Sequence, residues 1–266
     1  MSDVLILGYH GISERWSCDL AVRPGCFEWQ LGLLREWGYE GVTFERAMTD
    51  PPPGRCVAIT FDDAYRSVIE LALPIMRGFG MPGTVFVPTD YTGSERAMCW
   101  AGIDRWLGTA DEGELMPMSW DELGQLADAG WEIGSHTCSH PHLTRIDRGR
   151  LVAELEQSRT RCEEQLGRPS RTIAYPYGDV DQRVIETTKQ VGYSAGASIV
   201  PVPVRPFSIF NWPRTGVYLG DEQRRFRFKI TRRGRRLHAS GAWLTLSRTR
   251  AALWRGRPVE RAGPPA

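Results

Sequence analysis

The stretch CVAITFDDAY, residues 56–65, decides the class of fold. Its apolar, β-branched first half is typical of a buried strand, and the carboxylates of Asp62 and Asp63 follow where that strand would end. The same pattern recurs in VLILGYH (4–10), TVFVPTD (84–90), WEIGSH (131–136), TIAYPYG (172–178) and YSAGAS (193–198). Helical patterns that end in glycine separate most of these runs. Strands that alternate with helices predict a parallel α/β fold, and 266 residues suffice for one (β/α) barrel.

The composition excludes several classes of protein. Hydrophobic residues make up 41% and charged residues 24%, which is typical of a globular chain and excludes wholesale disorder. No apolar run reaches the roughly 20 residues of a membrane-spanning helix, and the start MSDVLILGYHGIS does not resemble a signal peptide. The six cysteines show no CxxC spacing, which favours reduced thiols over disulfides or a zinc knuckle. We therefore expect a cytoplasmic protein.

The charge is distributed unevenly along the chain. The net charge is +1, but residues 224–266 hold thirteen basic residues and one acidic residue. This asymmetry predicts a barrel domain of residues 1–222 and a basic, partly amphipathic extension of residues 223–266. Residues 239–257 can form a helix that lies on an anionic membrane surface, which would make the protein peripheral at the inner membrane, or one that packs across the barrel. Nucleic acid is a weaker candidate, because no recognition motif accompanies the charge.

Two histidines, His136 and His140, stand four residues apart in SHTCSH (135–140). In a parallel barrel the carboxyl ends of the strands meet at one end, so both histidines would lie near the two aspartates. One carboxylate and two imidazoles form an open site for a divalent metal, with Zn²⁺ first and Fe²⁺, Co²⁺ or Ni²⁺ as alternatives. The second carboxylate is then free to act as a general base. A glycosidase is the competing interpretation, but adjacent residues rarely reach its carboxyl separation of about 5–9 Å.

Two further segments bear on the site. In AYPYG (174–178) the N–H of Tyr177 can point into the site as an oxyanion donor, although a simple β-turn explains the same residues. Residues 91–118 form a long excursion between a strand and the next helix, either as a surface loop or as a wall of the substrate site.

Three motifs in order, TFDDAY, SHTCSH and AYPYG, resemble those of the polysaccharide deacetylases of carbohydrate esterase family four, the nodulation-factor deacetylase homology domain. The opening ILGYHGIS resembles the branch that deacetylates poly-N-acetylglucosamine. The resemblance covers about residues 4–215. It implies a distorted (β/α) barrel in a single domain that removes acetyl groups from an N-acetylated sugar or glycoconjugate. A sugar-binding module without activity and a metal amidohydrolase acting on a non-sugar amide are the alternatives.

The resemblance also implies roles for individual residues. Asp62 is the general base, Asp63, His136 and His140 bind the metal, and the Tyr177 N–H stabilises the oxyanion. The general acid is His10, at the end of the first strand, unless that histidine is merely packed there.

The chain departs from the common family pattern at the arginine that orients the base. Many members carry this arginine where the chain has Ala174, and we assign its role to Arg214. Tyr65 and Trp212 are candidate substrate contacts, and Trp212 fits the core equally well. His238 is a poor candidate for the acid, because neighbouring arginines favour its neutral form.

Overall fold

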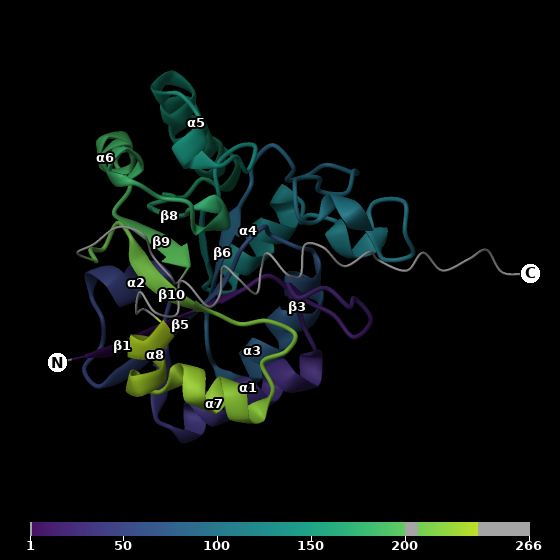
Figure 1. Cartoon of the computed structure of the whole chain (residues 1–266), viewed down its shortest axis with the longest axis vertical. Coiled ribbons are helices and arrows are strands. Elements are labelled where there is room, and N and C mark those ends of the chain that lie inside the picture. The colour runs from purple at the N-terminus through teal and green to yellow at the C-terminus, as the bar shows by residue number, and fades with distance from the viewer. Residues whose placement is uncertain (1, 200–206, 239–266) are drawn as a thin grey trace, which may run out of the picture.

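The computed structural model describes residues 2–199 and 207–238, and these form a closed barrel of parallel strands (Figure 1). Around the barrel the order is β1, β5, β6, β7, β8, β9, β10 and back to β1, and every neighbouring pair is parallel. The strands are β1 (Asp3–Tyr9), β5 (Arg55–Phe61), β6 (Gly83–Val87), β7 (Glu132–Ser135), β8 (Thr172–Ala174), β9 (Ala195–Ile199) and β10 (Trp212–Gly216). The predicted (β/α) barrel is confirmed.

Three short strands lie outside this ring and were not predicted. Strand β4 (Tyr39–Gly41) pairs with the start of β5, while β2 (Gly11–Ile12) and β3 (Ala21–Val22) pair with each other. Strands of two or three residues carry too little periodic pattern to stand out in a sequence.

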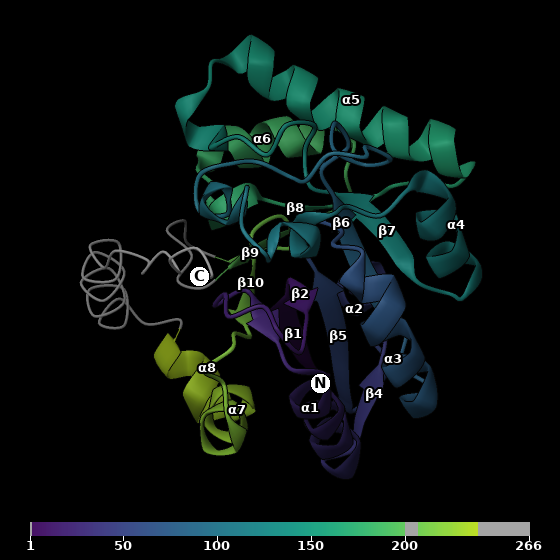
Figure 2. The ribbon, with the colours of Figure 1, turned by 90° about the vertical axis from the view of Figure 1, so that its right-hand side faces the viewer.

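Helices cover the outside of the barrel (Figure 2). They are α1 (Pro24–Glu36), α2 (Phe44–Thr49), α3 (Leu73–Phe79), α4 (Trp120–Asp128), α5 (Arg148–Leu166), α6 (Gln182–Val191), α7 (Gln223–Ile230) and α8 (Arg232–His238). Glycines with φ of 65°, 62° and 95° end α3, α5 and α6, as the sequence predicts. Of the helices in the described residues, none is both long and apolar enough to cross a membrane.

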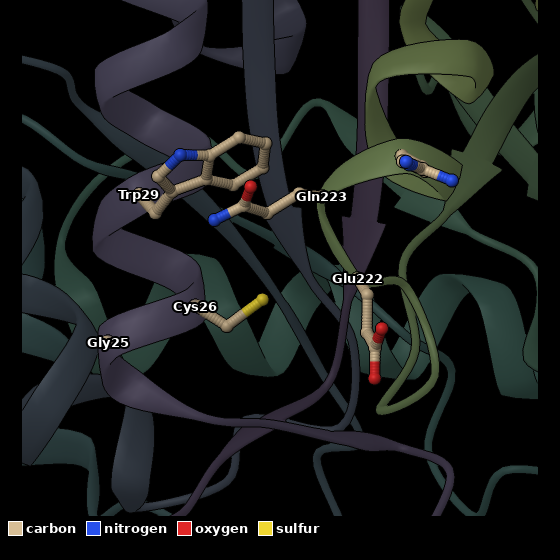
Figure 3. A pocket seen from close by; sticks show the side chains of 6 residues that line it. Gly25, Cys26, Trp29, Glu222 and Gln223 are labelled. Carbon is tan, nitrogen blue, oxygen red and sulfur yellow. The ribbon is translucent and has the colours of Figure 1, made fainter.

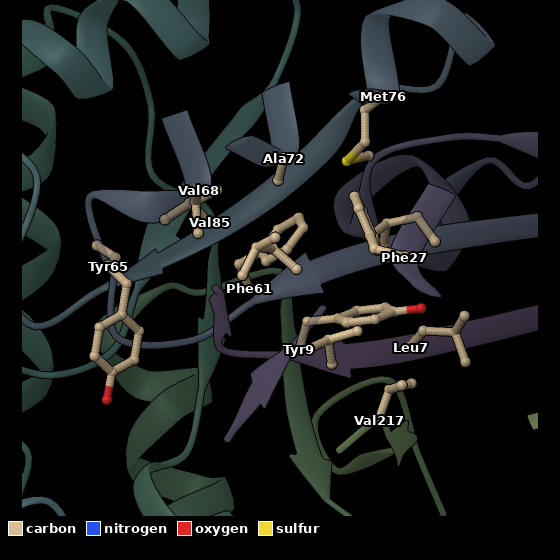
Figure 4. Packing of buried hydrophobic residues seen from close by; sticks show 14 of the residues in the cluster. Leu7, Tyr9, Phe27, Phe61, Tyr65, Val68, Ala72, Met76, Val85 and Val217 are labelled. Atoms are coloured by element: carbon tan, nitrogen blue, oxygen red, sulfur yellow. The ribbon is translucent and has the colours of Figure 1, made fainter. Parts of the chain in front are cut away.

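The register of β1 and β5 places two site residues side by side. These strands pair along their full length, from Asp3 opposite Arg55 to Tyr9 opposite Phe61. His10 and Asp62 are the next residue of each strand, so both emerge at the same carboxyl end. The residues before them, Tyr9 and Phe61, point the other way, into the core between the strands and the helices (Figure 4).

Helix α7, which begins directly after the predicted boundary at residue 222, packs onto the barrel. In α7 the side chains of Phe226 and Ile230 belong to the main hydrophobic core, with 0% and 1% of their surface exposed. Lys229 is buried beside them and donates to the carbonyl of Gly216 at 2.9 Å and to Asp221 at 2.5 Å. The abundance of basic residues in QRRFRFKI concealed two apolar positions four residues apart on one helix face. The predicted amphipathic helix of residues 239–257 lies outside the described residues.

Candidate metal centre and catalytic pocket

A pocket of about 310 Å³ opens at the carboxyl ends of the barrel strands. His10, Asp62, Asp63, His136, His140 and Tyr177 all line it. The sequence placed these six residues at strand ends, and the barrel brings them together because its strands are parallel.

A second hollow, of about 710 Å³, lies between α1 and the start of α7 (Figure 3). None of the predicted site residues lines it. Its only thiol, that of Cys26, has a raised pKa because of burial and the nearby carboxylates of Asp221 and Glu222, so it stays protonated. This hollow is larger than the pocket at the strand ends, but its lining residues do not form a catalytic or metal-binding group.

Asp63, His136 and His140 form one compact cluster of buried metal-ligating groups. The Asp63 Oδ1 atom lies 3.3 Å from His136 Nε2 and 3.4 Å from His140 Nε2. This oxygen is buried and has no hydrogen-bond partner within the part of the chain that the structure describes. A buried carboxylate oxygen without a donor, set between two imidazole nitrogens, fits the donor set of a divalent metal site with open positions.

The loops that carry these ligands contain a concentration of left-handed backbone. Within the described part of the chain, the non-glycine residues with positive φ are Asp63, Ala64, Thr137, His140 and Tyr177, and all five belong to the site loops. Such conformations cost of order 1–3 kcal/mol each and cluster at functional sites. Ala64 has φ 55°. The family that the motif TFDDAY resembles has glycine at this position, and glycine adopts this conformation without a steric penalty.

The two histidines differ in their surroundings. Burial favours the neutral form of His136, but the charges of Asp62 and Asp63 outweigh it and raise the pKa of that histidine. For His140, burial dominates and lowers the pKa to about 3. His140 is therefore a neutral imidazole at physiological pH, which is the form that ligates a metal.

Asp62 is held by Arg214, as the sequence predicts. The guanidinium donates from Nη1 to Oδ1 at 2.7 Å and from Nη2 to Oδ2 at 2.8 Å, and it also donates to Thr60 at 2.9 Å. Burial would raise the pKa of Asp62, but the charge of Arg214 holds it well below the usual range. Arg214 lies within β10, and its side chain is fully buried.

His10 lies beside this pair. Its Nε2 atom is 4.0 Å from the Asp62 Oδ2 atom, and 15% of its side chain is exposed. Its other ring nitrogen, Nδ1, is buried and has no hydrogen-bond partner among residues 2–199 and 207–238. The placement agrees with the predicted acid, while the role itself stays a prediction.

Tyr177 follows β8 at the opposite wall with φ 60° and ψ 6°. Its ring is 42% exposed and stacks on His142 with a centroid distance of 4.0 Å and an interplanar angle of 15°. Burial and the charge of Asp63 raise the pKa of its hydroxyl to about 12. His142 was not predicted, because only its place in the fold brings it under Tyr177.

The structure does not support Tyr65 and Trp212 as substrate contacts. Tyr65 is fully buried, packs against Trp16 with ring centroids 5.5 Å apart, and does not line the pocket. Trp212 packs partly buried against the cluster that includes Ile6 and Phe86. Both side chains occupy core positions, so the core alternative for Trp212 is the correct one.

The excursion of residues 91–118 forms a wall of the pocket. Trp100, Ile103 and Arg105 line it, together with Tyr218 from the loop after β10. The excursion therefore lines the pocket, while its contact with substrate stays a prediction. No periodic pattern in the sequence identifies these residues, because their positions depend on the loop's contacts with distant segments.

Comparison with known proteins agrees with this geometry. The family model described as polysaccharide deacetylase matches residues 49–196, which is more than half of the chain. The chain belongs to the polysaccharide deacetylase family. The resemblance of the three motifs is thereby confirmed.

Among curated relatives, the Bacillus subtilis protein YxkH, named as a candidate polysaccharide deacetylase, is 25% identical over 201 residues. The poly-beta-1,6-N-acetyl-D-glucosamine N-deacetylase of Staphylococcus aureus (strain MRSA252) is 27% identical over 165 residues. These alignments cover 74% and 59% of this chain, and 64% and 52% of the relatives. The chain thus spans less than two thirds of the length of either relative.

Solved structures show the same fold. The deacetylase PplD of Streptococcus pyogenes aligns with a TM-score of 0.69 at 20% identity, over 86% of this chain and 98% of its own. BC0361, a polysaccharide deacetylase from Bacillus cereus, aligns with a TM-score of 0.70 at 24% identity, over 86% and 69%. At these identities the likeness concerns the barrel alone.

Proposed function

We propose that the protein is a metal-dependent N-deacetylase that converts an N-acetylated sugar into acetate and an amino sugar. The observation that carries the proposal is the buried Asp63–His136–His140 cluster beside the Asp62–Arg214 pair, at the carboxyl end of a barrel of this family. The same residues could hold Zn²⁺, Fe²⁺, Co²⁺ or Ni²⁺, and the donor set suits zinc.

Each residue has a defined part in the proposed reaction. Asp62, kept ionised and oriented by Arg214, accepts a proton from the attacking water. The Tyr177 N–H donates to the carbonyl oxygen as negative charge develops there. A divalent metal held by Asp63, His136 and His140 would supply Lewis-acid polarisation of the acetamide carbonyl and of the water. His10 delivers a proton to the departing amine nitrogen as the C–N bond breaks, so that acetate and a free amine leave.

The position of His10 suits this last step. Its Nε2 atom lies 4.0 Å from the Asp62 Oδ2 atom, and both residues line the pocket. In the proposed reaction Asp62 accepts a proton from the water, and His10, which lies beside Asp62, donates a proton to the amine.

Metal content and acetate release test the proposal together. The purified protein should bind one equivalent of Zn²⁺ and release acetate from at least one member of a panel of N-acetylated sugars. The panel should include a poly-β-1,6-N-acetylglucosamine oligomer, a sugar nucleotide and a lipid-linked sugar, since a cytoplasmic location, as predicted, favours the latter two. Asp62→Asn is the matched control, because it keeps the ligand cluster and removes the base.

Two outcomes favour other functions. Metal binding without acetate release from any sugar would leave a sugar-binding module or an amidohydrolase acting on another amide. Release of acetate that persists after complete removal of the metal would overturn the metal-dependent mechanism.

A further inference from the structure

The indole of Trp100 lies flat on the imidazole of His140. Their ring centroids are 4.1 Å apart and their planes differ by 19°. The ring of Tyr177 meets the same imidazole edge-on at 4.6 Å and 69°. The His140 ring is therefore fixed on its face and at its edge by aromatic side chains from two different loops.

The other histidine of the cluster is oriented in a different way. His136 Nδ1 lies 2.8 Å from the carbonyl oxygen of Ala174, and a hydrogen bond of this kind usually fixes the ring of a ligating histidine. His140 Nδ1 is buried and has no such partner among the described residues. His140 also has a left-handed backbone, with φ 57°. No hydrogen bond from Nδ1 to the described residues fixes the His140 ring, and its backbone conformation is an unfavourable one. The stacking of Trp100 on the ring is therefore its main constraint.

Trp100 is itself held firmly enough to act as a support. Its ring meets Tyr91 edge-on at 5.0 Å and 76°, and its carbonyl accepts from the N–H groups of Ile103 at 3.2 Å and Asp104 at 3.1 Å. The excursion that carries Trp100 is joined to both ligand loops. Met118 N donates to the Ala64 carbonyl at 2.9 Å, directly after Asp63. Asp90 N donates to the Cys138 carbonyl at 3.0 Å, two residues before His140.

We propose that Trp100 is a positioning residue that orients His140 for metal binding, so that the excursion of residues 91–118 is part of the metal site as well as a pocket wall. This inference rests on the proposed metal-dependent function. Loss of a group that orients a ligand typically lowers metal affinity 10–100-fold, and we expect an effect of about that size here.

The test is the dissociation constant for Zn²⁺, measured on the full chain by competition with a chromogenic chelator. Trp100→Leu and Trp100→Met remove the flat ring but keep an apolar side chain in its place, and both should bind Zn²⁺ about 10–100-fold more weakly. Trp100→Phe keeps an aromatic face, so its affinity for Zn²⁺ should stay within about threefold of the wild type, below the 10–100-fold loss expected of the other two variants. Circular dichroism confirms that each variant is folded.

Trp106→Leu is the matched control in the same excursion. Its ring contacts Trp16 at 6.1 Å and does not line the pocket, so its loss should leave the affinity for Zn²⁺ unchanged. Equal affinities of the wild type, Trp100→Leu and Trp100→Met would overturn the inference alone. Equal weakening by Trp106→Leu would also overturn it, because the effect would then be general loop damage. A wild-type chain that binds no Zn²⁺ would instead overturn the proposed function, and this inference with it.

Discussion

Replacing Arg214 by methionine removes the cation on which the proposed base depends. The guanidinium and the Asp62 carboxylate share two hydrogen bonds of 2.7 and 2.8 Å, and their side chains are 0% and 4% exposed. Removing one partner of a buried ion pair costs about 3–5 kcal/mol, because the remaining charge is left uncompensated. Arg214→Met should therefore lower the free energy of unfolding at pH 7 by about this amount, as measured by urea denaturation.

The same substitution should change the dependence of activity on pH. In the wild type, burial raises the pKa of Asp62, and the charge of Arg214 more than compensates and lowers it. Without Arg214, burial prevails and the pKa of Asp62 rises. The acidic limb of the kcat/KM profile should therefore move to higher pH.

Unfolding in acid gives a further check on the sign. A carboxyl whose folded-state pKa is depressed contributes stability above its unfolded pKa of about 3.9, and that contribution is lost as pH falls toward the folded value. The difference in unfolding free energy between the wild type and Arg214→Met should accordingly shrink as the solution is acidified.

Two variants serve as controls. Arg214→Lys keeps the charge but loses the planar fork, so its unfolding free energy and acidic limb should lie between those of the wild type and Arg214→Met. Arg168→Met breaks a surface pair with Asp128, whose side chains are 51% and 73% exposed, and should change stability by less than about 1 kcal/mol. If Arg214→Met matched the wild type in both urea midpoint and acidic limb, Arg214 would not be holding Asp62.

Three other predictions concern separate residues. Asp62→Asn should keep metal and lower kcat at least about 100-fold, whereas Asp63→Asn should lose metal affinity; the reverse pattern in a metal assay would exchange their roles. His10→Ala should lower kcat about 100-fold and leave metal content unchanged, while His238→Ala should change neither; the opposite result would place the acid near the C-terminus. Burial raises the pKa of Glu132 in the folded protein to about 6. Glu132 therefore stabilises the folded state below the pKa that it has in the unfolded chain, and this stabilisation is lost as pH rises through 6. Glu132→Gln should abolish that decline in urea unfolding curves between pH 4.5 and 7, and an unchanged decline would assign it to another group.

Much of the site could be predicted because local sequence determines which way a strand residue points. In β5 every residue from Cys56 to Phe61 is buried, so the apolar run predicts a buried strand and places the Asp62 carboxylate at its carboxyl end. Alternation along β1 sends Tyr9 outward and His10 inward. Parallel strands then bring both residues to one end of the barrel, without any further information from the sequence.

The remaining features depend on contacts between distant segments. Trp100 reaches His140 only because the excursion is joined to two loops, and no periodicity marks that path. Tyr65 follows Asp62 and Asp63 closely in sequence, yet its side chain is buried in the core. The backbone is left-handed at Asp63 and Ala64, which turns the chain before Tyr65. The burial of Phe226 was not predicted because arginines surround it in the sequence. The density of charge does not indicate which face of a helix is buried.

Ala174 and Arg214 both bear on how the barrel interior supplies a cation to Asp62. Ala174 is fully buried in the cluster that fills the barrel together with Phe86, and the Arg214 guanidinium lies 5.4 Å from the centre of the Phe86 ring. The small side chain of Ala174 brings no second cation into this closely packed interior. A second buried arginine would also lack a carboxylate of its own, because both Asp62 oxygens already accept from Arg214. We therefore expect Arg214, on β10, to orient the proposed base Asp62 in a chain that has alanine at position 174.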